Sequence, residues 1–236
     1  MSSITIDSQK TFFFSDFLKD YYKGTKLDHL RTYAPSIEEI KKAIKGRQNF
    51  SPDKRERLVS VLTTQYADAG IQLEGKLARN INSLQDSKTF TITTGQQIHL
   101  GLGPLYVLYK AFDAIAISQE LADKYPDHRF VPVFWMASED HDLEEIAEID
   151  VFGNKVIWET NQKGPVGRMT TQGIAEVFST IKEQYNFDEV QKEFLAQCIK
   201  IYSTSTSLSE AFRRLLHTYL ADTGIVILDA DNAELK

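Results

Sequence analysis

The sequence predicts an α/β fold in which a helical N-terminal region leads into a parallel-sheet domain. Three apolar or β-branched segments support this: residues 89–93, 130–135 and 225–229. A helical pattern separates the first two, and a strand–helix–strand unit of that length requires a right-handed crossover with parallel pairing. The expected boundaries are 1–86 for the helical region, 87–236 for the sheet domain, and about 147–205 for an insertion within it.

Composition narrows the class of protein. The chain has 236 residues, 42% hydrophobic and 25% charged, which is typical of a globular protein with one large or two small domains. The formal net charge is -6, and the basic residues are scattered. We therefore expect a small-molecule partner and neither a nucleic acid nor a membrane surface.

The sequence contains no candidate membrane span or signal peptide and no second cysteine. No apolar run reaches the roughly 18 residues of a membrane span, and the first residues lack the pattern of a signal peptide, so we expect a cytoplasmic protein. Cys198 is the single cysteine, which excludes an internal disulfide and a cysteine-based metal cluster. Its apolar neighbours recur at helical spacing and predict a buried structural thiol.

The elements before the first strand are helical. Apolar spacing predicts a short amphipathic helix over Ile37–Lys45. Ser51 and Pro52 are suited to the N-cap and first position of a second helix, whose apolar side would carry Leu58 and Tyr66. A third helix is expected at about Gln72–Leu84.

The first strand is followed by a loop and a helix. Residues 89–93 are rich in β-branched side chains, and Pro104 is suited to a first helical position. The second strand covers residues 130–135, although Pro132 argues against a central place in the sheet because proline cannot donate to the ladder. The buried face of the helix is expected to consist of Leu105, Leu108, Phe112, Ile115 and Ala116.

The inserted segment begins with a hairpin. Gly153-Asn154 between two β-type runs predicts a tight two-residue turn. Two helices follow at about Ile174–Gln184 and Asp188–Tyr202, and Ser207 with Glu210 forms a capping-box pattern for another. The sheet resumes at 225–229, and the end at Lys236 leads us to expect a longer polypeptide.

A glycine-rich loop joins the first strand to its helix. Gly95, Gly101 and Gly103 permit positive φ values and close approach of a ligand, and the N–H groups on either side of Pro104 are expected to face an anion such as phosphate. The glycine spacing fits neither the dinucleotide fingerprint nor a P-loop. Gln96 and Gln97 could bind a ligand or satisfy the loop backbone. His99 could stabilise phosphate charge or simply face solvent.

An acidic segment follows the second strand. Glu139, Asp140, His141 and Asp142 place three carboxylates and an imidazole within four residues, more than a helix cap requires. The carboxylates can hold an ammonium group or hydrated Mg²⁺, and the imidazole can carry a proton. No second histidine or cysteine lies at ligand spacing, so no transition-metal site is expected. In an open α/β sheet, both segments would lie at the carboxyl edge, where ligands bind.

These motifs together resemble the BshC family, the cysteine-adding enzymes of bacillithiol biosynthesis. The matching residues are Thr94-Gly-Gln-Gln97, Gly103-Pro-Leu-Tyr106 with Lys110, and Pro132-Val-Phe-Trp135 leading into Glu139-Asp-His-Asp142. A looser match extends through Gly164-Pro-Val-Gly167 and the last strand. His99 and Gly101-Leu102 lie outside the matched pattern.

The resemblance implies a Rossmann-like core akin to that of class I aminoacyl-tRNA synthetases, of which this chain would be the N-terminal half. It also implies a homodimer formed through a C-terminal coiled coil that this chain lacks. The implied reaction joins L-cysteine to glucosaminyl-malate, the last step of bacillithiol biosynthesis. Forming the amide requires an activated carboxylate, for which ATP and Mg²⁺ are the expected cofactors.

On this hypothesis the loop binds nucleotide phosphates and the acidic segment carries the catalytic groups. Glu139 and Asp140 would hold the cysteine ammonium or the metal, and His141 would assist proton transfer. Two alternatives stay open: an adenylate-forming enzyme or nucleotidyl transferase for another small acid, and a non-catalytic nucleotide-binding fragment. The residues expected to bind the cofactor are Thr94, Gly95, Gln96, Gln97 and Gly103.

Overall fold

The computed structural model describes residues 6–7, 10–24, 27–34 and 36–236. It contains two compact units, Met1–Phe50 and Ser51–Lys236. The expected helical region covers residues 1–86, whereas in the structure α3 (Pro52–Asp68) and α4 (Gly75–Ser83) belong to the unit with the sheet. Their apolar side chains pack in the same core as the strands, which explains why the boundary precedes them.

The described residues of the first unit include two short α-helices. In α1 (Asp16–Lys23), the Ser15 side chain accepts the N–H of Leu18, and Gly24 ends the helix in the left-handed conformation. The predicted helix at 37–45 is confirmed as one 3₁₀ turn continuing into α2 (Ile40–Arg47). Within this unit, Arg31 donates to Asp28 and to the carbonyl of Tyr21.

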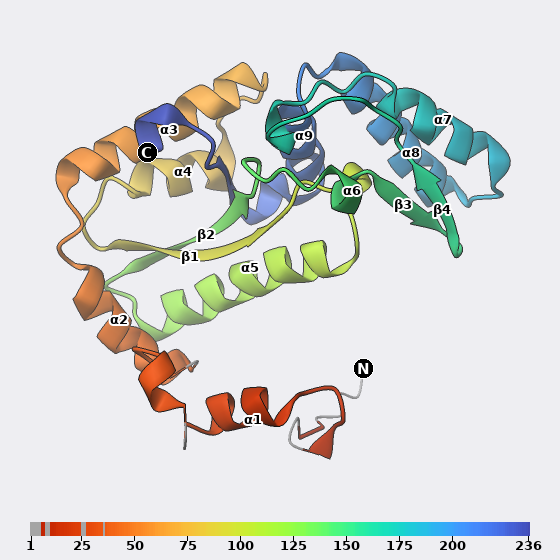
Figure 1. The fold of residues 1–236 in the computed structure, drawn as a ribbon. Coiled ribbons are helices and arrows are strands. Elements are labelled where there is room, and N and C mark those ends of the chain that lie inside the picture. The colour runs from red at the N-terminus through yellow and green to blue at the C-terminus, as the bar shows by residue number, and fades with distance from the viewer. Residues whose placement is uncertain (1–5, 8–9, 25–26, 35) are drawn as a thin grey trace. The chain divides into compact units, whose positions relative to one another are not determined.

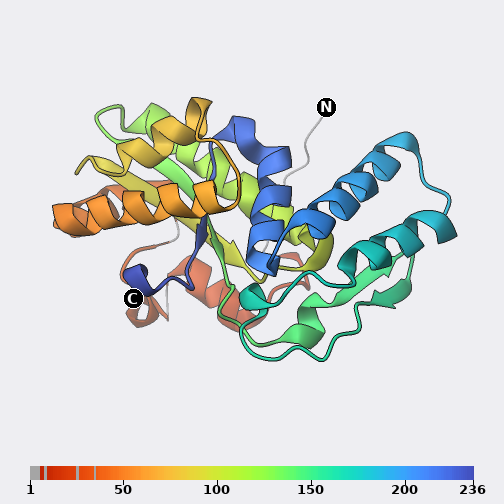
Figure 2. The ribbon, with the colours of Figure 1, turned by 90° about the horizontal axis from the view of Figure 1, so that it is seen from above.

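The second unit is built on a parallel sheet of three strands, so the predicted α/β Rossmann-like class is confirmed. In Figure 1, α5 (Tyr106–Lys124) lies below the sheet and α3 and α4 lie above it, and Figure 2 shows the latter pair from above. Parallel pairing brings all three carboxyl ends to one edge. The strands, in the order β1-β2-β5, are β1 (Thr89–Gln96), β2 (Arg129–Met136) and β5 (Val226–Asp229).

Strand β2 is central, which corrects the expectation drawn from Pro132. The N–H groups of Arg129 and Ala137 donate to carbonyls at Lys88 and Gln96, so the odd-numbered N–H groups of β2 face β1. The nitrogen of Pro132 therefore lies on the β5 side. Pairing with β5 begins only at Val133, so the proline costs the ladder no hydrogen bond.

Helix α5 (Tyr106–Lys124) begins two residues after Pro104 and buries a different face from the one expected. Of the predicted residues only Ile115 is buried, and Leu105 and Phe112 are exposed. The buried positions are mostly small, which lets the helix axis approach the strands closely. Large apolar side chains occur on more than one side of this helix, so periodicity alone could not show which side packs against the sheet. The buried residues are Val107, Ala111, Ala114, Ile115, Ser118 and Leu121.

The outer edge of β5 is bound by side chains from α3 and α9 (Leu208–Leu220). The N–H of Ile227 donates to the hydroxyl of Tyr66 at 2.8 Å, and the Ile227 carbonyl accepts from Arg213. The Gln65 amide binds both backbone groups of Asp229, at 3.0 and 2.8 Å. Arg213 is 3% exposed, also donates to Gln65, and lies over the Tyr66 ring. Buried backbone groups that no strand pairs are thus satisfied.

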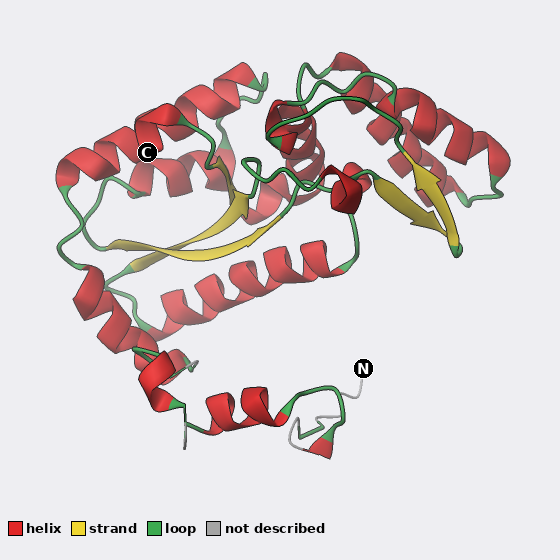
Figure 3. Cartoon of the chain, in the orientation of Figure 1, coloured by secondary structure: helices red, strands yellow, loops and turns green. Residues whose placement is uncertain are grey.

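The insertion contains a small antiparallel hairpin, separate from the main sheet (Figure 3). Its turn lies at Phe152-Gly153, one residue earlier than predicted, because Val151 pairs with Asn154. Both turn residues have positive φ, as a type I′ turn requires. The elements are α6 (Leu143–Ile146), β3 (Glu148–Val151) and β4 (Asn154–Ile157).

Three helices complete the unit. Asp188 and Gln191 form a full capping box at the start of α8, whereas Glu210 in α9 binds Thr206 instead of the Ser207 backbone, so the predicted box there is only half formed. Cys198 is fully buried as predicted, and burial raises the pKa of its thiol to about 12. The helices are α7 (Ile174–Gln184), α8 (Glu189–Thr204) and α9 (Leu208–Leu220). Among the helices of the described residues, none has the length and apolar character needed to span a membrane.

Candidate functional site

The three segments that follow the strands meet at the carboxyl edge of the sheet. The N–H of Ala137 extends the β1–β2 ladder to the Gln96 carbonyl at 3.1 Å. The hydroxyl of Ser138 donates to the carboxylate of Asp229, at the end of β5. The glycine-rich loop and the acidic segment are therefore neighbours, as the sequence predicted from parallel pairing.

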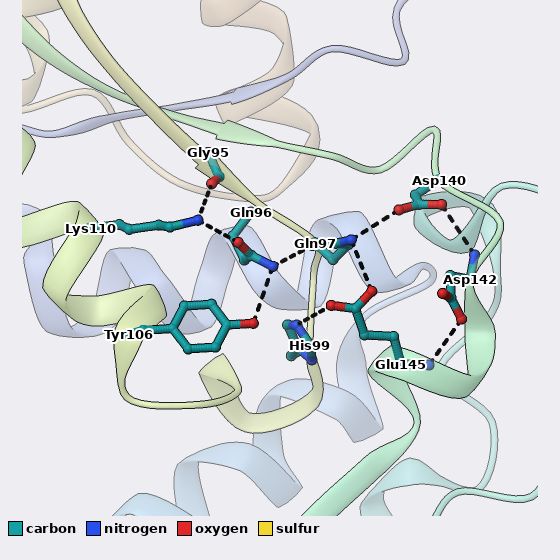
Figure 4. A network of polar contacts seen from close by, with 9 residues as sticks. All are labelled: Gly95, Gln96, Gln97, His99, Tyr106, Lys110, Asp140, Asp142 and Glu145. Carbon is teal, nitrogen blue, oxygen red and sulfur yellow. Dashed lines mark hydrogen bonds and ion pairs between the residues drawn. The ribbon is translucent and has the colours of Figure 1, made fainter. Parts of the chain in front are cut away.

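A chain of polar side chains connects the two segments, and we call it the amide relay: Lys110, Gln96, Gln97, Asp140 and Glu145 (Figure 4). Lys110 Nζ donates to Gln96 Oε1 at 2.7 Å, and Gln96 Nε2 donates to Gln97 Oε1. Gln97 Nε2 then donates to Asp140 Oδ2 at 3.2 Å and to Glu145 Oε2 at 3.0 Å. The relay runs from one cation to two carboxylates.

Asp140 organises the acidic segment. Its Oδ1 atom accepts the N–H groups of His141 at 2.7 Å and Asp142 at 3.2 Å. The bond from the His141 N–H is the main cause that holds the pKa of Asp140 below its usual value, and the Gln97 amide adds to it. Asp142 caps α6 by accepting the N–H of Glu145. The side chains of Glu139 and His141 are exposed and lie outside the relay.

His99 is buried, so the expectation that it simply faces solvent is wrong. It is 4% exposed, and its Nε2 atom lies 3.7 Å from Glu145 Oε1. Burial lowers the pKa of the imidazole, and the Glu145 carboxylate opposes that shift only in part. The ring is therefore neutral near pH 7.

The glycines act mainly by shaping the loop. Residues 101–103 all have positive φ, including Leu102. The N–H of Gly101 donates to the Tyr202 hydroxyl, and that of Gly103 donates to the Leu100 carbonyl. The prediction that the N–H before Pro104 faces an anion is therefore wrong, because this group is already bonded within the loop. A Cβ at Gly103 would lie 2.4 Å from the His99 Cβ, and one at Gly95 would lie 2.9 Å from the Trp135 carbonyl oxygen. Thr94 is half-buried within β1, paired with Phe134.

The loop around 164–168 is hydrogen-bonded to the backbone of the acidic segment. The N–H of Val166 donates to the Asp140 carbonyl at 2.7 Å, and that of Gly167 donates to the Ser138 carbonyl at 2.8 Å. Arg168 binds Asp231 through two atoms, at 2.6 and 2.9 Å. These bonds hold the backbone after β2 in place and thereby position the Asp140 carboxylate.

Replacing Asp231 by asparagine should remove a pH-dependent part of the stability. Hydrogen bonds from Arg168 and then Lys236 lower the Asp231 pKa to about 2. Since the folded-state pKa is depressed, this stabilisation is present above about pH 4 and is lost as pH falls toward 2. Arg168 is 67% exposed, so solvent screening limits the effect to about 1 kcal/mol. The free energy of unfolding, measured in urea between pH 7 and pH 3, should depend less on pH in Asp231→Asn than in the unmodified chain. An equal dependence on pH in the two proteins would contradict this.

A large cleft lies beside the relay, between the glycine-rich loop, the hairpin and helices α7 to α9. Its volume is about 1660 Å³, and its walls are mostly apolar and aromatic. His99 and Glu145 are part of its lining, whereas Gln96, Gln97 and Asp140 are not. Six carboxylates and no lysine or arginine line it. The cleft is larger than the 300–1,000 Å³ typical of small-molecule sites.

Three residues of this site were not assigned a role from the sequence: Tyr106, Lys110 and Glu145. Tyr106 and Lys110 are one helical turn apart at the start of α5, a spacing that places both on one side and could have indicated a paired role. Glu145 carried no such signal, because its contact with Gln97 spans 48 positions in the chain. Among the described residues, no three His, Cys, Asp or Glu side chains are placed to hold a metal ion together.

Comparison with known proteins gives consistent matches. The sequence profile described as "Bacillithiol biosynthesis BshC, N-terminal Rossmann-like domain" matches residues 1–236. Proteins named "Putative cysteine ligase BshC" are similar along nearly the whole chain: one from Cytophaga hutchinsonii is 41% identical over 98% of this chain and 41% of its own length. Those from Flavobacterium psychrophilum and Flavobacterium johnsoniae are each 38% identical over 100% of this chain and 45% of their own length. The chain thus spans less than half the length of these relatives.

Proposed function

Because this chain belongs to the BshC family, whose N-terminal Rossmann-like domain matches it throughout, we propose that it forms part of a bacillithiol biosynthesis ligase acting in the cytoplasm. The proposed reaction joins L-cysteine to the amine of glucosaminyl-malate. The observation that carries the proposal is the amide relay at the carboxyl edge of a parallel sheet, which is where α/β enzymes bind their ligands. Dimerisation of the whole protein through a coiled coil stays a prediction.

The relay has the chemistry to hold an amino acid. The two carboxylates at one end of the relay, Asp140 and Glu145, can accept hydrogen bonds from the ammonium group of an amino acid. Asp140 is held ionised by its hydrogen bonds and can accept from a substrate ammonium. The exposed Glu139 and His141 stand next to it, where Glu139 can add negative charge and His141 can take up the proton released by an attacking amine.

The site fits the expected cofactor in part. Lys110 offers an ammonium to phosphate oxygens, whereas the N–H groups of Gly101 and Gly103 are already bonded inside the protein. We therefore propose that Lys110, Gln96 and Gln97 face the nucleotide, and that Thr94, Gly95 and Gly103 give the strand end and the loop their shape. ATP would supply the energy that activates the cysteine carboxylate. Mg²⁺ is usually held by phosphates, waters and one or two carboxylates, and Asp140 and Glu139 are the candidates.

Ligand binding tests the proposal. Titration of this chain by calorimetry with L-cysteine, ATP and glucosaminyl-malate, with and without Mg²⁺, should show binding that Asp140→Asn weakens at least tenfold. Gln97→Ala should have a similar effect, because it removes the donor shared by Asp140 and Glu145. Matched controls are Asp113→Asn and Gln119→Ala on the exposed side of α5. Binding that is equal in all four variants would contradict the site, and tighter binding of another small acid would contradict the substrate.

A further inference from the structure

Two neighbouring glutamine amides in the relay have a defined direction. A carboxamide presents an acceptor on one side and two donors on the other, so each amide could in principle face either way. Gln96 directs its Oε1 to Lys110 and its Nε2 to Gln97, and Gln97 directs its Nε2 to both carboxylates. Gln96 Nε2 also lies 3.3 Å from the Tyr106 hydroxyl.

The charged groups at both ends of the relay determine this direction. An ammonium has donors only, so Lys110 can bind the oxygen of Gln96 but not its NH₂ group. Asp140 and Glu145, when ionised, only accept, so they can bind the NH₂ group of Gln97 but not its oxygen. Reversing one amide would bring two oxygens or two NH₂ groups together at the Gln96–Gln97 contact. The two amides therefore turn together or not at all.

Lys110 is itself held in one place. Its Nζ atom lies 3.4 Å from the carbonyl oxygen of Gly95 and 5.5 Å from the centre of the Tyr106 ring. The Gly95 carbonyl belongs to β1, and Tyr106 lies one turn earlier in α5, so the ammonium is fixed between the sheet and the helix. Its side chain is otherwise exposed, so replacing it should not disturb the core.

We propose that Lys110 is a positioning residue that sets the orientation of both glutamine amides and so aims Gln97 at Asp140 and Glu145. This inference rests on the proposed function, because it gives the relay the task of presenting an ordered, ionised carboxylate to the amine of a substrate. Lys110 acts on that carboxylate through two intervening side chains.

The test uses the ligand-free chain, so that it does not depend on turnover. NMR of the glutamine side-chain NH₂ groups reports the hydrogen bonding of Gln97, and a carboxyl-carbon pH titration reports the pKa of Asp140. In Lys110→Met the Gln97 NH₂ resonances should move toward solvent-exposed values, and the Asp140 pKa should rise part of the way to its usual value, since the His141 N–H bond remains. Lys110→Arg should restore both, because arginine is also a pure donor.

Lys182→Met, at an exposed lysine in the last turn of α7, is the matched control and should leave both signals unchanged. If Lys110→Met leaves the Gln97 resonances and the Asp140 titration as in the unmodified chain, the positioning role is wrong. The two proposals fail separately. Calorimetry with L-cysteine should show about tenfold weaker binding in Lys110→Met. An unmodified chain that binds no ligand, yet shows the coupling by NMR, would overturn the proposed function and leave the role of Lys110 standing.

Discussion

Replacing Arg213 by methionine should lower the free energy of unfolding of the Ser51–Lys236 unit by about 2–4 kcal/mol, because buried acceptors lose their donor. Arg213 donates to the Ile227 carbonyl and, at 2.8 Å, to Gln65 Oε1. Methionine fills similar volume but leaves both acceptors without that donor in a buried environment. Fluorescence-detected urea unfolding can measure the loss, because both tryptophans, Trp135 and Trp158, lie in this unit.

Arg214→Met provides the matched control for this experiment. Arg214 is the next residue of the same helix, but it binds Glu210 at 3.3 Å and Ser205 at the partly exposed surface. The Arg214 and Glu210 side chains are 24% and 19% exposed, and a helical pair of this kind contributes up to about 1 kcal/mol. Equal losses in the two variants would show that the β5 edge does not depend on Arg213.

The second large effect is expected at Gly167, whose N–H donates to the Ser138 carbonyl next to the acidic segment. A Cβ at this position would lie 2.4 Å from both Ser138 Cβ and Ser209 Oγ, and 2.9 Å from the Ser138 carbonyl oxygen. Gly167→Ala should therefore cost about 3 kcal/mol, at the upper end of overpacking effects. Because the Gly167 N–H donates to that same carbonyl, the backbone leading to Asp140 should also shift. Thermal unfolding and the Asp140 amide resonance would measure the two consequences.

Gly70→Ala separates steric overlap from the general cost of adding a side chain. Gly70 has φ of 67°, and a Cβ there would meet nothing within 4 Å. Its replacement should cost about 1 kcal/mol, the penalty for a left-handed alanine. A loss at Gly167 no larger than the loss at Gly70 would mean that the loop yields easily and does not hold the acidic segment.

Prediction from the sequence succeeded where the signal was local. The strands β1 and β2, the helix α7 and the N-cap at Ser51 follow from side-chain type and spacing over a few residues. Parallel pairing then placed the glycine-rich loop beside the acidic segment. Prediction failed at the buried face of α5, where large apolar residues occur on more than one side of the helix. It also failed by one residue at the turn of the hairpin.

The candidate site was predicted only in outline. Gln97 and Asp140 were expected to be neighbours, and they share a hydrogen bond. That Lys110 orders the two amides, that Glu145 is the second acceptor, and that His99 is buried all depend on contacts between residues far apart in the chain. The spacing of residue types along the chain does not show such contacts.

The α/β class, the order of most elements and the two segments at the carboxyl edge could be predicted from local patterns, because hydrogen bonding and apolar spacing act within a few residues. The buried face of each helix, the N–H groups available to a ligand and the direction of the relay side chains could not. These properties depend on packing and on the pairing of donors with acceptors across elements. Each has several arrangements that are equivalent locally, and only contacts with residues far along the chain distinguish them.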